Sequence, residues 1–108
     1  MIYVVYLLQL IQHKYYVGLT PKHRLKIREK EHQQGGGSKW TNRFPPVQLI
    51  DTWEFPTKKQ AEEFEIEKTE EYLHLYGIDS TRGGLCNYGQ EGGYEFWVRP
   101  HLQHLIPV

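Results

Sequence analysis

The chain has 108 residues, of which 39% are hydrophobic and 14% aromatic, and its 13 Lys and Arg balance 13 Asp and Glu. This length and composition are typical of one folded domain and exclude a disordered chain. The single cysteine, Cys86, excludes a disulfide framework and a four-cysteine zinc site.

A β-hairpin is predicted at the start of the chain. Residues 3–11 and 15–19 are rich in Val, Tyr, Leu and Ile, and three polar residues separate them. The apolar start is too short to span a bilayer, and it lacks the basic beginning and small-residue cleavage site of a secretory signal. We therefore expect a soluble, cytoplasmic protein without a membrane partner.

A helix is predicted next, because Thr20 can cap a helix and Pro21 suits its first position. We expect this helix to continue to about Gln34, where a Gly-rich loop begins that extends to Pro45-Pro46. The next apolar stretch, residues 47–55, predicts a third strand.

A second helix is predicted from Lys58 to Tyr76, because this stretch contains no Gly or Pro and Gly77 follows it. Beyond it, the Gly-rich residues 82–84 and 89–93 are expected to form loops. Residues 94–98 are expected to form a short strand or an aromatic plug.

The second helix carries one acid in an unusual place. On a helical wheel Glu65 falls within a stripe otherwise made of Ala61, Thr69, Tyr72, Leu73 and Tyr76. A carboxylate that faces a core needs a cation, a metal or hydrogen bonds to offset its desolvation. A salt bridge to Lys68 or a partly solvated edge of the stripe is an equally open alternative. Glu62 also falls toward this face, but an acid in the first turn is interpreted as structural.

The charges are distributed unevenly along the chain. Residues 1–46 carry eight Lys and Arg against two Asp and Glu, whereas residues 47–76 carry three against eight. In the first helix Arg24, Arg28 and His32 form one row at four-residue spacing, which would suit a phosphodiester. The alternative is a solvated face on which Glu29 and Glu31 pair with the arginines.

Two tyrosines of the hairpin, Tyr6 and Tyr16, are predicted on adjacent strands and the same face. A catalytic tyrosine would need its ordinary pKa of about 10 lowered by nearby cations or a metal. Arg28 and a metal at Glu65 are the candidates for this effect. The alternative is that both tyrosines belong to the core or its rim.

Taken in order, these motifs resemble the GIY-YIG nuclease family, in its compact type with little beyond the nuclease module. The matching positions are Val4-Val5-Tyr6, Tyr16-Val17-Gly18, Arg28, His32, Phe64-Glu65 and Asn87. The resemblance covers about residues 2–88 and implies an α+β fold with a three-stranded antiparallel sheet flanked by helices. It implies a nuclease domain at residues 1–90 and a C-terminal extension at 91–108 that packs on or beside it.

The fit to the family pattern has three gaps. Asn87 falls in a Gly-rich stretch expected to be a loop and could be a plain turn residue. Val4-Val5 replaces the Gly-Ile of the first tripeptide, and the spacing from Gly18 to Arg28 is about two residues longer than in the pattern. Either Arg24 or Arg28 is therefore a candidate for the family arginine, and the four-residue offset from His32 favours Arg28.

The resemblance implies a metal-dependent DNA endonuclease that leaves a 3′-hydroxyl and a 5′-phosphate. Glu65 is similar to the metal-binding carboxylate, for Mg²⁺ or Mn²⁺, and Arg28 to the arginine that contacts the scissile phosphate. Tyr6 or Tyr16, with a lowered pKa, would activate the attacking water, and Asn87 would support the site. The choice between the two tyrosines stays open.

Further contacts with duplex or branched DNA are predicted for Arg24, His32, Lys39, Trp40 and Arg43, which combine cations with an aromatic ring. Trp40 could equally cover the core. Specificity for the DNA substrate is expected to come from loops, a homodimer or partner proteins. The competing functional hypothesis is a catalytically silent nucleic-acid-binding module, or a subunit of a larger nuclease complex.

Overall fold

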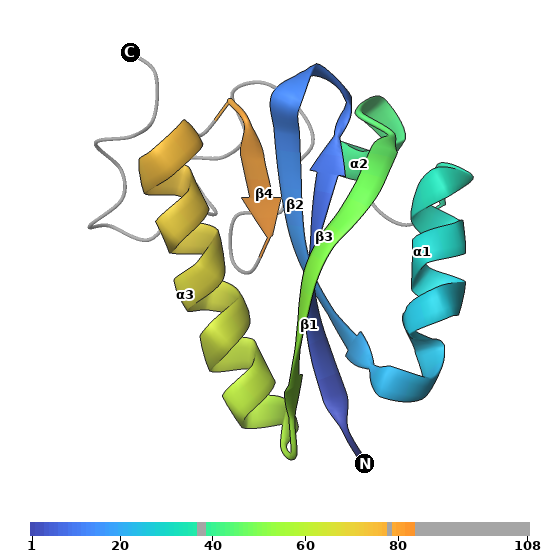
Figure 1. Cartoon of the computed structure of the whole chain (residues 1–108), viewed down its shortest axis with the longest axis vertical. Helices are drawn as coiled ribbons and strands as arrows, with labels where there is room; N and C mark the ends of the chain where they lie inside the picture. The colour runs from blue at the N-terminus through green and yellow to red at the C-terminus, as the bar shows by residue number, and fades with distance from the viewer. Residues whose placement is uncertain (37–38, 78, 84–108) are drawn as a thin grey trace.

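The structure, a computed structural model, describes residues 1–36, 39–77 and 79–83 (Figure 1). Its elements follow in the order β1 (Tyr3–Leu10), η1 (Ile11–His13), β2 (Lys14–Pro21), η2 (Lys22–Arg24), α1 (Leu25–Gln33), α2 (Lys39–Arg43), β3 (Pro46–Phe55), α3 (Lys58–Tyr76) and β4 (Thr81–Gly83), where η marks a 3₁₀ turn. The predicted α+β class, hairpin, third strand and long helix are confirmed.

The sheet has four strands in the order β3-β1-β2-β4, so the predicted three-stranded sheet is wrong. β1 is antiparallel to both β2 and β3, whereas β4 is parallel to β2 and pairs with Tyr15, Tyr16 and Val17. Residues 82 and 83, predicted as loop, belong to β4. The reason lies in the tertiary structure. This short Gly-containing segment becomes a strand because it pairs with the edge of β2, and the local composition cannot reveal a partner so far away in the chain.

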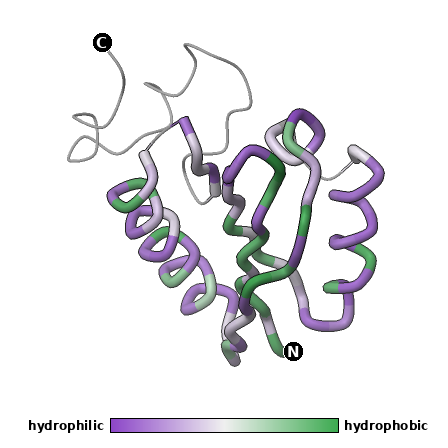
Figure 2. The backbone as a smooth tube through the Cα atoms, turned by 45° about the horizontal axis from the view of Figure 1, so that its top comes forward, coloured by the Kyte–Doolittle hydropathy of each residue, from purple (hydrophilic) through white to green (hydrophobic). Residues whose placement is uncertain are grey.

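Helices cover both faces of the sheet (Figure 1). On β1 the side chains alternate, so that Tyr6, Leu8 and Leu10 pack toward α1 and α2, and Val5 and Leu7 pack toward α3. Figure 2 shows the hydrophobic residues concentrated along the central strands, while α1 is hydrophilic over most of its length. The buried core therefore lies on the two faces of β1 and β2.

The first helix begins later than predicted. Thr20 and Pro21 do not start it, because they continue the ladder with β1, where they pair with Val4 and Tyr3. The amide of Lys22 donates to the carbonyl of Ile2 at 2.8 Å, which extends this pairing by one bond. A helix-start signal in the sequence was thus outweighed by cross-strand hydrogen bonds.

The predicted loop between residues 35 and 46 contains a short helix, α2, whose Trp40 packs against Phe44 with ring centroids 4.7 Å apart. The long helix α3 has the predicted bounds. Thr57 caps it by accepting from the amide of Gln60, and Gly77 ends it with a φ of 86°.

Some predictions lie outside the described residues, namely those on Asn87, residues 89–98 and the extension at 91–108. Within the described part of the chain, no helix combines the length and apolar character needed to cross a membrane.

Candidate functional site

The two predicted tyrosines lie side by side on the face of the sheet that α1 and α2 cover. Their ring centroids are 6.3 Å apart, and both side chains are buried. Tyr6 pairs across the strands with Gly18, and its ring lies where a side chain of residue 18 would be. A Cβ placed on Gly18 would be 2.2 Å from the ring carbon Cζ of Tyr6. Gly18 is therefore required for the ring of Tyr6 to cross β2.

A buried chain of hydrogen bonds holds the Tyr6 hydroxyl. The hydroxyl oxygen lies 2.7 Å from Nε2 of His32 in α1, and Nδ1 of His32 lies 2.7 Å from the Thr41 hydroxyl in α2. Burial, reinforced by Arg28, lowers the pKa of His32 to about 4, so its ring is neutral at pH 7. A neutral imidazole offers one donor and one acceptor, which matches its two hydroxyl partners.

Arg28 lies at the same hydroxyl. Burial lowers the pKa of its guanidinium, but the two tyrosines and Glu31 outweigh burial, so that the pKa is raised. Arg24 lies in η2 with its side chain about half exposed, and its ion pair is with Glu31. The contact with Tyr6 therefore favours Arg28 over Arg24 as the arginine of the site.

Glu65 reaches this group of residues from α3, on the other side of the sheet. Among the residues that the structure describes, the pairing of β2 with β4 ends at Val17, and the ring of Tyr6 crosses β2 one residue further, at Gly18. The Glu65 carboxylate contributes to raising the pKa of Tyr6, so the two groups lie within electrostatic reach. The structure thus brings together Tyr6, Tyr16, Arg28, His32 and Glu65.

The Glu65 carboxylate is largely buried, and burial, with a smaller effect of Glu62, raises its pKa to about 7. The alternative of a salt bridge to Lys68 is wrong, because Lys68 bonds Glu71 at 2.6 Å. Glu62 pairs with Lys58 at 3.9 Å, which agrees with its structural interpretation. Among the described residues, no hydrogen bond or ion pair involves the Glu65 carboxylate.

The expectation of a lowered tyrosine pKa is not met at Tyr6. Burial raises the pKa of its hydroxyl above the ordinary value, Tyr16 raises it further, and the opposing effect of Arg28 is smaller. The physical reason is that a phenolate in the core loses its hydration, which one partly buried cation does not restore. Tyr6 is therefore protonated in this structure and its hydroxyl can donate.

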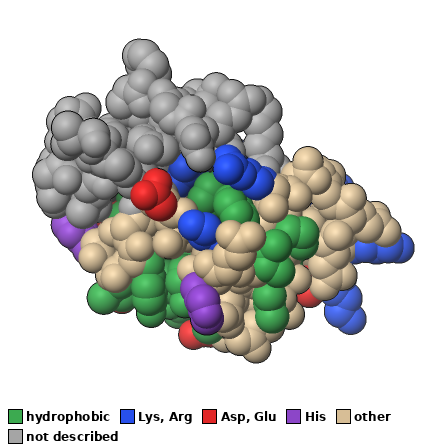
Figure 3. All heavy atoms as spheres, turned by 90° about the horizontal axis from the view of Figure 1, so that it is seen from above, with side chains coloured by type: hydrophobic (Ala, Val, Ile, Leu, Met, Phe, Trp, Pro, Cys, Tyr) green, Lys and Arg blue, Asp and Glu red, His purple; other side chains and the backbone are tan. Residues whose placement is uncertain are grey.

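The side chain of Lys39, predicted to touch nucleic acid, lies outside the described part of the structure, and the other residues predicted to do so differ in exposure. His32 and Trp40 are buried, and the Trp40 indole donates to the carbonyl of Tyr15 at 3.0 Å, which agrees with its alternative role in covering the core. Arg43 is exposed, and its guanidinium lies 5.3 Å from the ring centre of Phe44, while Nζ of Lys14 lies 5.2 Å from the same ring centre. Figure 3 shows cations beside hydrophobic side chains at this end of the molecule.

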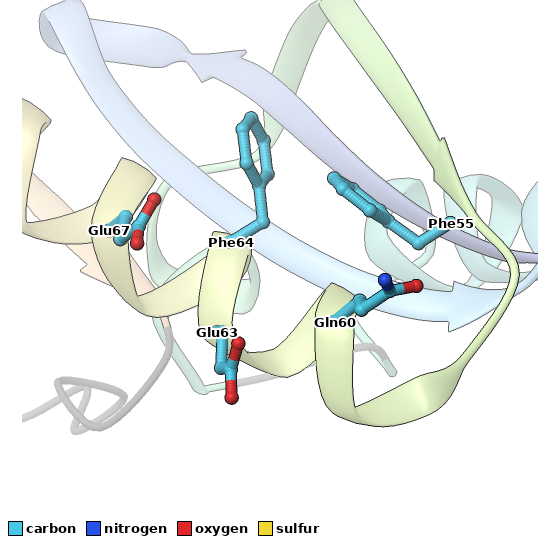
Figure 4. A pocket seen from close by; sticks show the side chains of 5 residues that line it. All are labelled: Phe55, Gln60, Glu63, Phe64 and Glu67. Atoms are coloured by element: carbon cyan, nitrogen blue, oxygen red, sulfur yellow. The ribbon is translucent and has the colours of Figure 1, made fainter.

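A pocket of about 240 Å³ lies away from these residues, between the end of β3 and the first turns of α3 (Figure 4). Its lining combines two rings tilted by 42° with centroids 5.0 Å apart, Phe55 and Phe64, with the acids Glu63 and Glu67. These acids are exposed and lie on the helix face opposite Glu65. The pocket therefore does not belong to the group around Tyr6.

One residue near Tyr6 was not predicted from the sequence. Thr41 lies in a stretch expected to be a loop, and no local pattern indicates its contact with His32. The alternative in which Glu31 pairs with the arginines is confirmed, because its carboxylate lies 3.7 Å from Arg24 and 3.3 Å from Arg28. The spacing of residues 24, 28 and 31 along one helical face was the available signal for this bridge.

A tyrosine pair, an arginine and a buried carboxylate thus converge from four elements. A family model of the GIY-YIG catalytic domain matches residues 2–75 of this chain. The chain belongs to the GIY-YIG family. The two tyrosines expected from the resemblance to match the two signature tripeptides, Tyr6 and Tyr16, are the two that the structure places together, with ring centroids 6.3 Å apart. GIY-YIG domains are nuclease domains that act on DNA and generally depend on divalent metals.

A curated relative is the UPF0213 protein BH0048 of Halalkalibacterium halodurans, which is 36% identical over 63 residues. The alignment covers 58% of this GIY-YIG chain and 65% of the relative. Among solved structures, this chain matches the solution NMR structure of the UPF0213 protein BH0048 from Bacillus halodurans at 32% identity and a TM-score of 0.40. The match covers 70% of this chain and 86% of the BH0048 chain.

Proposed function

We propose that this GIY-YIG chain is a metal-dependent DNA endonuclease. The observation that carries the proposal is the convergence of three elements on the Tyr6 hydroxyl, which interacts electrostatically with Arg28 of α1 and Glu65 of α3. A purely structural core has no need for a largely buried carboxylate near a tyrosine, because burial raises the free energy of its charged form. A phosphodiester and a cation between these groups would offset that cost.

The site fits a hard divalent cation such as Mg²⁺ or Mn²⁺. Glu65 is a largely buried carboxylate with no hydrogen bond or ion pair among the described residues, and a bound cation would stabilise its charged form. The same residues contain no cluster of three or more His, Cys, Asp or Glu. One protein carboxylate suits Mg²⁺, which keeps most of its waters, better than Zn²⁺. When bound, the cation would supply charge stabilisation at the phosphate and the leaving oxygen.

The residues of the chain have distinct proposed roles. Arg28 neutralises the charge that develops on the phosphate during in-line attack, and the products carry a 3′-hydroxyl and a 5′-phosphate. Tyr6 and His32 form the buried support that keeps Arg28 in place. Arg43 and Lys39 contact the DNA backbone outside the site.

Tyr16 is the proposed contact for the attacking water. Tyr6 has no exposed surface, whereas Tyr16 keeps 5% of its surface exposed. The Tyr6 hydroxyl is also protonated, because burial raises its pKa. A base must reach the proton that it removes, so exposure favours Tyr16.

The test is cleavage of labelled duplex, branched and single-stranded DNA with Mg²⁺ or with EDTA. We expect cleavage only with the metal, and a loss of at least about 10²-fold in kcat for Arg28→Ala and for Glu65→Ala. Glu63→Ala, which removes an exposed acid of the same helix, is the matched control and should cleave like the wild type. A fully active Glu65→Ala protein would overturn the mechanism. Salt-sensitive binding without any cleavage would instead select the silent binding module.

A further inference from the structure

The two arginines of α1 and η2 share one carboxylate. Oε2 of Glu31 lies 3.3 Å from Nη1 of Arg28, and Oε1 lies 3.7 Å from Nη2 of Arg24. Among the described residues, Oε1 is buried without a hydrogen bond, so the charge of Arg24 is what holds it there. Glu31 thus spans two guanidinium groups with its two oxygens.

This arrangement resembles the one that a phosphodiester would adopt. A phosphodiester also presents two charged oxygens on one atom, and arginine binds such a pair through parallel hydrogen bonds. Arg28 is the same residue that interacts with Tyr6, so the Glu31 carboxylate contacts an arginine of the site itself. The side chain of Glu31 is 35% exposed, which leaves it able to move away into water.

We propose that Glu31 is an internal competitor for the phosphate, which DNA displaces from Arg24 and Arg28. This inference rests on the proposed function and adds a determinant of its specificity. In the free protein the carboxylate neutralises the two cations, so a passing phosphodiester gains little from them. A phosphate bound in the site makes further contacts with the other residues of the site, and these offset the free-energy cost of displacing Glu31. Glu31 therefore lowers affinity for DNA in general and favours correctly seated phosphates.

The competitor is tested by comparing Glu31→Gln with Glu29→Gln in the full-length protein. Both changes remove one negative charge from α1, so the general electrostatic effect is matched. Binding of fluorescein-labelled duplex DNA is followed by anisotropy in EDTA over a series of NaCl concentrations. We expect E31Q to bind about three- to tenfold more tightly than E29Q at low salt, as for the loss of competition from partly exposed ion pairs.

A double-mutant cycle with Arg24→Gln identifies the route of the effect. If Glu31 competes at the arginines, the gain from E31Q should shrink when Arg24 is absent, because the carboxylate then masks one cation instead of two. Equal affinities of E31Q and E29Q, or an undiminished gain in the R24Q background, would overturn the inference and leave the proposed function intact. No salt-sensitive binding by the wild type or by E31Q would overturn both.

Discussion

Gly18→Ala is expected to disrupt the site from within the sheet. The new Cβ would be 2.2 Å from Cζ, 2.3 Å from the hydroxyl oxygen and 2.6 Å from Cε2 of Tyr6. Carbon atoms in contact are normally about 3.5–4 Å apart, so the ring must move by more than 1 Å. The ring is fully buried and its hydroxyl is bonded to His32, so movement strains the packing and breaks this bond.

The cost follows from these two effects. Overpacking a buried site costs about 1–3 kcal/mol, and loss of the buried hydrogen bond adds about 1 kcal/mol or more. The sum, about 3 kcal/mol, is a large fraction of the roughly 5–15 kcal/mol that stabilises a domain. For a domain of this size it corresponds to a fall in Tm of roughly 12 to 24 °C.

Urea unfolding at pH 7 measures this loss. Gly36→Ala is the matched control, because its Cβ would meet nothing closer than the Glu31 carbonyl at 3.8 Å, and it should change stability by less than about 0.5 kcal/mol. In the Tyr6→Phe background the overlap with the ring remains but the hydroxyl is gone, so G18A should cost about 1 kcal/mol less there. A G18A protein as stable and as active as the wild type would refute the close approach of Tyr6 to β2.

Three further predictions concern ionisation and the tyrosine pair. Burial lowers the pKa of His32 to about 4, so between pH 4 and 6.5 the unfolded chain binds a proton that the folded chain does not. The contribution of His32 to the free energy of unfolding should therefore be complete above about pH 6.5 and be lost toward pH 4. In urea titrations, His32→Gln should lose less stability over this pH range than His23→Gln, the control at an exposed site. Burial raises the pKa of Glu65 to about 7, so the contribution of Glu65 to stability is present below about pH 4.5 and is lost as the pH rises through 7. At pH 8 the Glu65→Gln protein should therefore have a higher Tm than the wild type. Mg²⁺ should raise the Tm of the wild type but not that of Glu65→Gln. Tyr16→Phe should lower kcat at least about 10²-fold and by more than Tyr6→Phe does, and a larger loss for Tyr6→Phe would transfer the contact with water to Tyr6.

Local signals predicted the elements that depend on local chemistry. The Thr57 cap, the absence of Gly and Pro and the stop at Gly77 correctly bounded α3, and helical spacing placed Glu65 on its inner face. The same kind of signal failed at Thr20-Pro21, where pairing with β1 decided the backbone conformation. β4 could not be predicted, because its strand geometry depends on a partner far away in the chain.

The candidate site shows the same division. Spacing along one helix favoured Arg28 over Arg24, and the structure supports that choice through the contact with Tyr6. The pKa of Tyr6 could not be predicted from the sequence, because it depends on how deeply the ring is buried and on how strongly the charge of Arg28 offsets that burial. The hydrogen bond from His32 to Thr41 joins two helices, and no sequence pattern reports it.

β4 also has a consequence for the order in which the chain acquires its structure. Its pairing with β2 joins segments separated by most of the described chain, and parallel pairing of this kind forms slowly because a long loop must first close. During synthesis the hairpin and α1 emerge first, and the edge of β2 has no strand partner until residues 81–83 are made. The family match ends at residue 75, before this strand, so a chain cut there would lose the buried Thr81 and Arg82 and leave β2 open to pairing with other chains.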